Sequence, residues 1–217
     1  MKKKNNIYNL ILTIIAFLIP IIFYNKLPNL MPSHFNISGE VNSYINKNIG
    51  AFLAPVIMIV IWIGMVYLPK VDPKRSHYAK FAKSYGLILN LLITFFFIIQ
   101  LVIISVSLGV NVPVNTVIPF AVGLMFIVIG NYMPKSKSNF FYGIKTPWTL
   151  SSEISWRKTH RLGGILFVLS GIIIAISSLM FNGYIIFPIL VTCTIVSVLT
   201  SFFASYIFAK KAGDIKK

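Results

Sequence analysis

Six long apolar runs dominate the sequence and restrict how the chain can fold. They cover residues 7–24, 49–68, 86–108, 114–132, 162–181 and 184–209. A helix of about 20 residues, rising about 1.5 Å per residue, crosses a hydrocarbon layer of roughly 30 Å. Lipid offers no partners to backbone N–H and C=O groups, so each run must pair them internally. The sequence therefore predicts an all-α integral membrane protein with six transmembrane helices.

The composition supports this class. Apolar residues make up 57% of the 217 residues and charged residues only 11%, whereas a soluble domain has about 25% charged residues. The fourth run is the weakest, because it contains Pro119 and Gly123. The first run follows a basic start and is expected to be an uncleaved signal anchor. The single cysteine, Cys193, excludes an intrachain disulfide.

Positive charge is distributed unevenly between the loops. The chain has 20 Lys and Arg against 4 Asp and Glu, a net charge of +16. Three of these cations precede the first run, five lie between the second and third, six between the fourth and fifth, and four follow the sixth. Only Lys26 and Lys47 lie in the alternate loops. The positive-inside rule then predicts a multi-pass protein of the cytoplasmic membrane with both termini in the cytosol. Anionic lipid accounts for the basic charge, and nucleic acid is not expected as a partner.

The apolar runs contain no Asp, Glu, Lys, Arg or His, and their most polar side chains are amides such as that of Gln100. Ion-coupled transport needs titratable groups inside the membrane, so it is disfavoured. A facilitator of neutral solutes remains open. No paired carboxylates, metal-ligand cluster or nucleophile–base motif is evident. We therefore expect no enzyme activity, no catalytic residue, no cofactor and no metal.

The chain divides into two expected halves of three helices each. Residues 1–110 include a long outer loop, 25–48, and residues 111–217 include a long inner loop, 133–161. The first and fourth runs are followed by similar tetrapeptides, NLMP and NYMP. Three spans per half would give the halves opposite topologies, so an inverted repeat is one hypothesis.

The outer loop is rich in Pro, Asn, Ser and Gly, which predicts turns rather than a long helix. A lone histidine is a poor metal site, because zinc usually has three or four protein ligands. His34 is therefore expected to form hydrogen bonds. The candidate ligand-contact residues of this loop are His34, Phe35, Asn36, Gly39 and Glu40.

The inner loop mixes aromatic and basic residues, which suits the headgroup zone of a membrane. Pro147 favours an extended residue before it and a helix start after it. We expect a short interfacial helix, capped by Thr149 or Ser151, that runs into the fifth span. The loop is either a membrane-lying connector or a specific cytosolic surface. A second inner loop has an aromatic stripe expected to act as an interfacial anchor: Tyr78, Phe81 and Tyr85.

Two segments of the inner loop, NFFYGIKTPWTL at 139–150 and WRKTHRLG at 156–163, resemble the signature of the SdpI family. The outer segment PSHFNISGE at 32–40 is similar to a small uncharacterised domain that often precedes that signature. The inner motif residues are Asn139, Gly143, Lys145, Pro147, Trp148, Thr149, Trp156 and His160. Two positions depart from the family pattern. Lys145 stands where Arg is common, and Asn42 where Asp is common, so charge-based contacts at these positions would differ.

The resemblance implies a bacterial immunity protein that protects the cell against a secreted toxic peptide acting at its membrane. Some members of the family are also described as signalling. The implied partners are membrane lipid, the secreted peptide and, for signalling, a cytosolic regulatory protein. Two alternatives remain: a membrane receptor that relays to a cytosolic regulator, and a transporter of small solutes without ion coupling.

Overall fold

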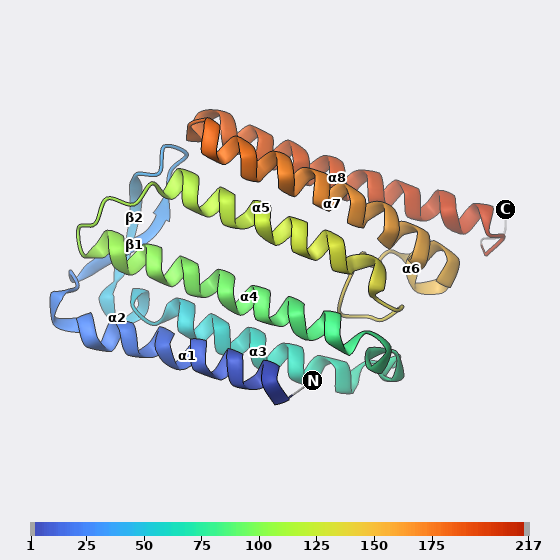
Figure 1. The fold of residues 1–217 in the computed structure, drawn as a ribbon, viewed down its shortest axis with the longest axis horizontal. Coiled ribbons are helices and arrows are strands. Elements are labelled where there is room, and N and C mark those ends of the chain that lie inside the picture. Colours follow the sequence, from blue (N-terminus) through green and yellow to red (C-terminus); the bar gives the residue numbers. More distant parts are fainter. Residues whose placement is uncertain (1–2, 215–217) are drawn as a thin grey trace.

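The computed structural model describes residues 3–214 and is built from six long helices (Figure 1). These helices are α1 (Lys3–Phe23), α3 (Leu53–Val71), α4 (Tyr78–Ser107), α5 (Val114–Tyr132), α7 (Glu153–Met180) and α8 (Gly183–Lys211). Within the described residues all six are long and apolar enough to cross a membrane. The prediction of an all-α protein with six membrane-spanning helices is confirmed.

The long helices lie side by side in two groups (Figure 1). Helices α1, α3 and α4 pack together, and helices α5, α7 and α8 pack together, with α4 next to α5. The outer loop lies at one end of the bundle. The short helix α6 (Pro147–Ser151) and both chain termini lie toward the other end. Which end faces the cytosol stays a prediction, and three of the lysines behind it, Lys2, Lys216 and Lys217, lie outside the described residues.

Two helices begin well before their apolar runs. Helix α4 begins at Tyr78 rather than near residue 86, and α7 begins at Glu153 rather than near residue 162. The early turns of α7 are stabilised by a cap, because the Ser152 hydroxyl accepts a hydrogen bond from the Ser155 N–H at 3.0 Å. Hydropathy alone misses such turns, since they are buried by protein loops rather than by lipid.

The outer loop contains a β-hairpin that the sequence did not predict. Strands β1 (Leu30–Phe35) and β2 (Val41–Asn46) pair antiparallel, and the one-turn helix α2 (Lys47–Gly50) leads into α3. The connecting turn, residues 36–40, is held by the Asn36 carboxamide oxygen, which accepts from the N–H groups of Ser38 and Glu40 at 3.0 and 2.9 Å. Gly39 has φ +84°, a conformation that favours glycine. Pro32 lies within β1, and proline lacks the N–H group that a paired strand donates to its neighbour. The sequence pattern therefore did not indicate a strand here.

Close glycine contacts join α5 to α7. A Cβ on Gly123 would lie 2.8 Å from the Gly171 carbonyl oxygen, and one on Gly130 would lie 2.5 Å from the Gly164 carbonyl oxygen. The paired glycines let the two backbones touch, as small residues do in membrane helix pairs. Gly123, which weakened the fourth run as a sequence signal, is therefore a packing residue, and α5 is continuous through Pro119.

Serine side chains line the contact between α7 and α8. The Ser170 and Ser197 hydroxyls are 2.8 Å apart, and the Ser155 hydroxyl donates to the Ser205 carbonyl at 2.7 Å. Ser201 donates to the Ser197 carbonyl of its own helix at 2.7 Å. The stripe of small polar residues on α8 thus packs against a neighbouring helix and does not line a pore.

Candidate functional site

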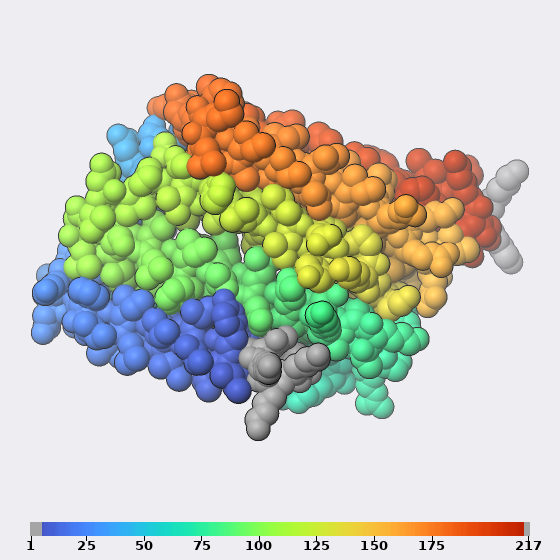
Figure 2. Space-filling model, in the orientation of Figure 1, coloured from blue at the N-terminus to red at the C-terminus, as the bar shows by residue number. Residues whose placement is uncertain are grey.

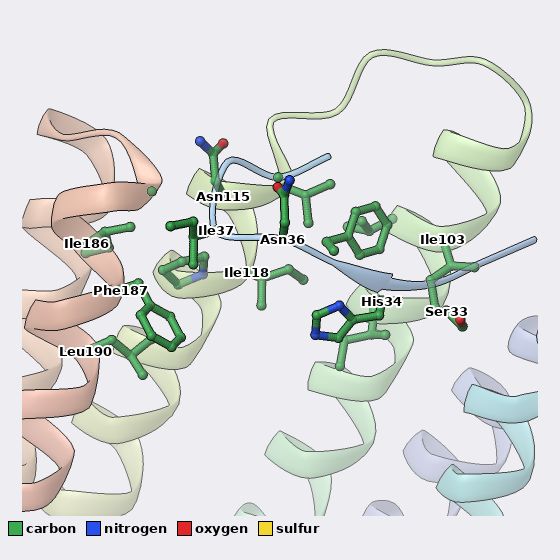
Figure 3. A pocket seen from close by; sticks show the side chains of 17 residues that line it. Ser33, His34, Asn36, Ile37, Ile103, Asn115, Ile118, Ile186, Phe187 and Leu190 are labelled. Carbon is green, nitrogen blue, oxygen red and sulfur yellow. The ribbon is translucent and has the colours of Figure 1, made fainter. Parts of the chain in front are cut away.

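A cavity of about 350 Å³ lies beneath the hairpin, at the end of the bundle away from the termini (Figure 3). The hairpin roofs it, and α4, α5 and α8 supply its walls. Most of the lining is apolar, with side chains from Ile99, Val102, Ile103, Ile118, Phe187 and Leu190. The space-filling view shows openings between the green α4 and the yellow-green α5 (Figure 2), the two helices through which the two groups meet.

Polar groups of this cavity come from its roof and from the start of α5. His34 lies on β1, and Figure 3 shows that its ring lies on the cavity side of the strand. Its Nδ1 atom is 2.6 Å from the Asn42 side-chain oxygen on β2. Asn42 therefore orients the ring with a neutral hydrogen bond, where an aspartate would use a charge. Asn36 and Asn115 add amide groups to the lining.

The hairpin tip is fixed against the second group of helices. A Cβ on Gly39 would lie 3.1 Å from the backbone nitrogen of Asn115, near the start of α5. The Ile37 carbonyl packs against Gly183 at the start of α8, where any side chain would collide with it. The tip thus bridges from the first half of the chain to the second, and closes the cavity from above.

Charge is sparse at this end. The exposed Glu40 carboxylate accepts a hydrogen bond of 2.9 Å from the Asn36 side chain, which itself lines the cavity. Lys47 points elsewhere: its ammonium group lies 3.4 Å from the Tyr24 and Leu27 carbonyls and 4.5 Å from the centroid of the Tyr24 ring. Of the five residues predicted in the outer loop, four line the cavity, and Glu40 is at its edge.

At the opposite end, residues 136–152 fold into a compact cap, organised by the buried side chain of Asn139. Its oxygen accepts from the Phe141 and Tyr142 N–H groups at 3.0 and 2.7 Å, and from the Tyr78 hydroxyl at 3.1 Å. Its nitrogen donates to the Lys137 and Tyr142 carbonyls at 2.8 and 3.0 Å. One amide thereby fixes both the loop and its contact with α4.

His160 is a second fixed point of the cap. Its Nε2 accepts from the Ile144 N–H at 3.0 Å, and its Nδ1 donates to the Trp156 carbonyl at 2.8 Å. The ring stacks on Trp156, with centroids 4.0 Å apart. Gly143, at φ +107°, leaves no room for a side chain above His160. Both nitrogens of the ring are occupied, so this histidine holds the loop in place.

The helix α6 begins in a capping box. The Thr146 hydroxyl accepts from the Thr149 N–H at 3.1 Å, and the Thr149 hydroxyl accepts from the Thr146 N–H at 2.9 Å. The prediction of Thr149 or Ser151 as the cap was wrong, because Thr146 caps α6 and Ser152 caps α7. Pro147 occupies the first helical position, where its missing N–H costs nothing.

The remaining motif residues differ in exposure. Trp148 packs on Phe202 and Tyr206 of α8, with ring centroids 5.4 and 5.2 Å apart. Lys145 is exposed, and within residues 3–214 its side chain has no hydrogen-bond partner. Lys145 therefore differs from motif residues such as Asn139 and His160, whose side chains are held by hydrogen bonds.

Asp72, the residue that follows α3, links the two groups of helices. Its carboxylate accepts from the Phe140 N–H at 2.9 Å, the Tyr78 hydroxyl at 2.8 Å and the Lys74 N–H at 2.7 Å. Burial alone would raise its pKa, but these donors and the Lys74 charge outweigh burial and lower the pKa below its ordinary value. The Lys74 ammonium also donates to the Ser138 hydroxyl at 2.6 Å.

The aromatic stripe of the second inner loop does not face the headgroups as expected. Tyr78, Phe81 and Tyr85 are buried and pack with Tyr142 of the cap. Ring centroids of Phe81 and Tyr142 are 6.1 Å apart. The cap covers these residues, which explains why α4 extends so far beyond its apolar run. Within residues 3–214, no group of three or more His, Cys, Asp or Glu side chains is placed to hold a metal ion.

Comparison with known proteins gives matches to two separate stretches of the chain. Residues 135–205 match the SdpI/YfhL protein family, a stretch that begins at the cap and continues through α7 into α8. We call residues 135–205 the SdpI region, after the family whose model they match. Residues 11–59, which contain the hairpin, match a domain of unknown function, DUF1648. Both resemblances expected from the motifs are confirmed.

Two relatives resemble the chain over very different lengths. The chain is 29% identical over 208 residues to the Immunity protein SdpI of Bacillus subtilis (strain 168), covering 96% of this chain and 97% of the relative. It is 38% identical over 47 residues to the Uncharacterized membrane protein YbgB of the same organism, covering 22% of this chain and 52% of that protein. No solved structure matches the chain.

Proposed function

We propose that this chain is an immunity protein of the bacterial cytoplasmic membrane that protects the cell against a secreted toxic peptide. The observation that carries the proposal is the similarity to the Immunity protein SdpI, which extends over 96% of this chain and includes the hairpin as well as the cap. A likeness confined to the SdpI region would support only a shared membrane-anchored cap.

The geometry is compatible with this role. The charge distribution favours an orientation with both termini in the cytosol, which would place the hairpin and its cavity on the outer side. A peptide that arrives from outside would meet the hairpin first. The outer contact residues are then His34, Phe35, Asn36, Gly39 and Glu40, with membrane lipid around the helices.

The cap favours a second role, relay to a cytosolic regulatory protein. Its backbone is fixed by buried hydrogen bonds, yet Phe140 and Phe141 are 40% and 37% exposed, and Lys145 is free. A rigid loop that displays apolar rings beside a cation has the character of a recognition surface. Under this proposal the same protein signals the presence of the peptide.

A survival assay tests the primary proposal. A strain lacking the gene is challenged with peptides secreted by the organism that carries it, with and without re-expression of the chain. We expect re-expression to restore growth, and His34→Ala and Glu40→Ala to reduce the protection at matched expression. Equal killing with and without the chain, for every secreted peptide, would contradict the proposal.

The same assay separates the two ends of the molecule. Trp148→Ala and His160→Ala alter the cap and leave the hairpin intact. If only these two variants lose protection while both outer variants keep it, the working site lies at the cap. A crosslinking experiment from Lys145 that recovers only lipid would count against relay to a protein.

A further inference from the structure

The cavity beneath the hairpin has the size and the walls of a ligand site. Its volume of about 350 Å³ lies within the range of roughly 300–1,000 Å³ that is usual for small-ligand pockets. Figure 3 shows Ile118 near the centre of the walls, with Phe187 and Leu190 of α8 opposite Ile103 of α4. An apolar group bound there would remove its own surface and the surface of the cavity walls from contact with water or mobile lipid.

The charged residues near the rim of the cavity restrict the kind of ligand that would bind there. Glu40 is one hydrogen bond away from the lining residue Asn36, whereas neither Lys26 nor Lys47 lines the cavity. The other acids that the structure describes lie at the cap: Asp72, Glu153 and Asp214. A phospholipid would bring an anionic phosphate to a rim without a cation. A ligand with a positive charge next to its apolar part would instead meet the Glu40 carboxylate at this rim.

We propose that this cavity binds one apolar side chain of a peptide, and that Glu40 binds a positive charge adjacent to that side chain in the peptide. The inference rests on the proposed function, because it names the chemistry that an outer peptide would present. The roof is fixed at Gly39 and Gly183 before any ligand arrives, so binding costs little ordering of the protein. His34, whose ring lies on the cavity side of β1, supplies a hydrogen-bonding group for the peptide backbone next to the buried side chain.

The test uses two fluorescent probes on the full chain in nanodiscs of neutral phosphatidylcholine. Dansylcadaverine joins an aromatic group to an amine, and dansylglycine joins the same group to a carboxylate. We expect saturable binding of dansylcadaverine above the signal of empty nanodiscs, and little binding of dansylglycine. Equal binding of the two probes, or no saturable binding of the amine, overturns the proposal.

Variants with matched controls test the assignment of the two contacts. Ile118→Trp fills the cavity and should weaken dansylcadaverine binding about tenfold or more, whereas Leu124→Trp, on the exposed side of the same helix, should not. Glu40→Gln should weaken it roughly two- to fivefold, the effect expected of an exposed charge, and Glu153→Gln at the other end should leave it unchanged. An unchanged affinity in Ile118→Trp removes the cavity from the proposal.

Two further outcomes separate this inference from the proposed function. If native mass spectrometry finds a phospholipid retained by the wild type and lost in Ile118→Trp, the cavity is a lipid site and the inference is wrong. If the chain protects cells and Ile118→Trp protects equally well, the inference fails while immunity stands. If the amine binds as expected and re-expression never restores growth, immunity fails while the binding site stands.

Discussion

At the scale of single residues, Tyr78 of α4 and Tyr142 of the cap both have buried hydroxyl groups, but only one of the two hydroxyls is hydrogen-bonded. Tyr78 donates to Asp72, whereas the buried hydroxyl of Tyr142 has no hydrogen-bond partner in the described part of the chain. Burial raises the pKa of Tyr142 to about 12, so it stays neutral. We expect Tyr78→Phe to lower the free energy of unfolding by about 1–3 kcal/mol, and Tyr142→Phe to leave it unchanged or raise it slightly. Thermal unfolding in detergent measures both, and equal losses would contradict the assigned contacts.

Asp72 makes the cap sensitive to acid. Its pKa is lowered in the folded protein, so its stabilisation is fully present above the ordinary aspartate pKa and is lost as the pH falls through the lowered value. We expect Asp72→Asn to destabilise the protein by about 2–4 kcal/mol at neutral pH. The variant should also lose the part of the acid-induced destabilisation that protonation of Asp72 causes in the wild type. Unfolding followed from about pH 7 to about pH 3 measures both effects.

The control for this prediction is Glu153→Gln, which removes an exposed carboxylate from the first turn of α7. It should cost no more than about 1 kcal/mol, the size of a helix-dipole effect. Trypsin cleavage at Lys137 and Lys145 reports on the cap directly and should accelerate only in Asp72→Asn. The same acid response in Asp72→Asn and the wild type would show that another group is responsible.

At the scale of elements, the contact between α5 and α7 depends on the absence of side chains. We expect Gly130→Ala to destabilise the protein by about 1–3 kcal/mol, because its Cβ would lie 2.5 Å from the Gly164 carbonyl and the helices would have to separate. Gly64→Ala in α3 is the matched control. Its Cβ would meet only the Leu68 side chain, at 3.9 Å, and it should stabilise the helix by about 0.5–1 kcal/mol. Unfolding of both variants in one detergent provides the measurement, and equal effects would argue against close packing.

At the scale of the whole molecule, the orientation in the membrane is the prediction on which the outer site depends. Ser43 on β2 and Lys145 in the cap are both exposed, and they lie at opposite ends of the bundle. In a Cys193→Ala background, we expect Ser43→Cys to react with an impermeant maleimide added to intact cells. Lys145→Cys should react only after the membrane is opened. The reverse pattern would place the cap outside and the hairpin inside.

The sequence predicted the scaffold well, and the sites less completely. The apolar runs identified all six long helices, and the motifs identified the SdpI region and the hairpin domain. The cavity was not predictable, because its walls come from α4, α5 and α8, whose lining residues look like any lipid-facing isoleucine or phenylalanine. Asp72 was visible as one of only four acids, yet its partner Phe140 lies 68 residues away in the chain. The division into halves and the inverted repeat stay predictions.

What the sequence determined by itself was the number and class of the spans, because lipid forces each long apolar run to satisfy its own backbone as a helix. Local rules also predicted turns in the outer loop and a helix start beside Pro147. Only the tertiary structure decided that the hairpin tip closes on Asn115 and Gly183, and that the cap closes on Asp72. Contacts of this kind join residues distant in sequence, and they depend on how helices pack, which hydropathy does not encode.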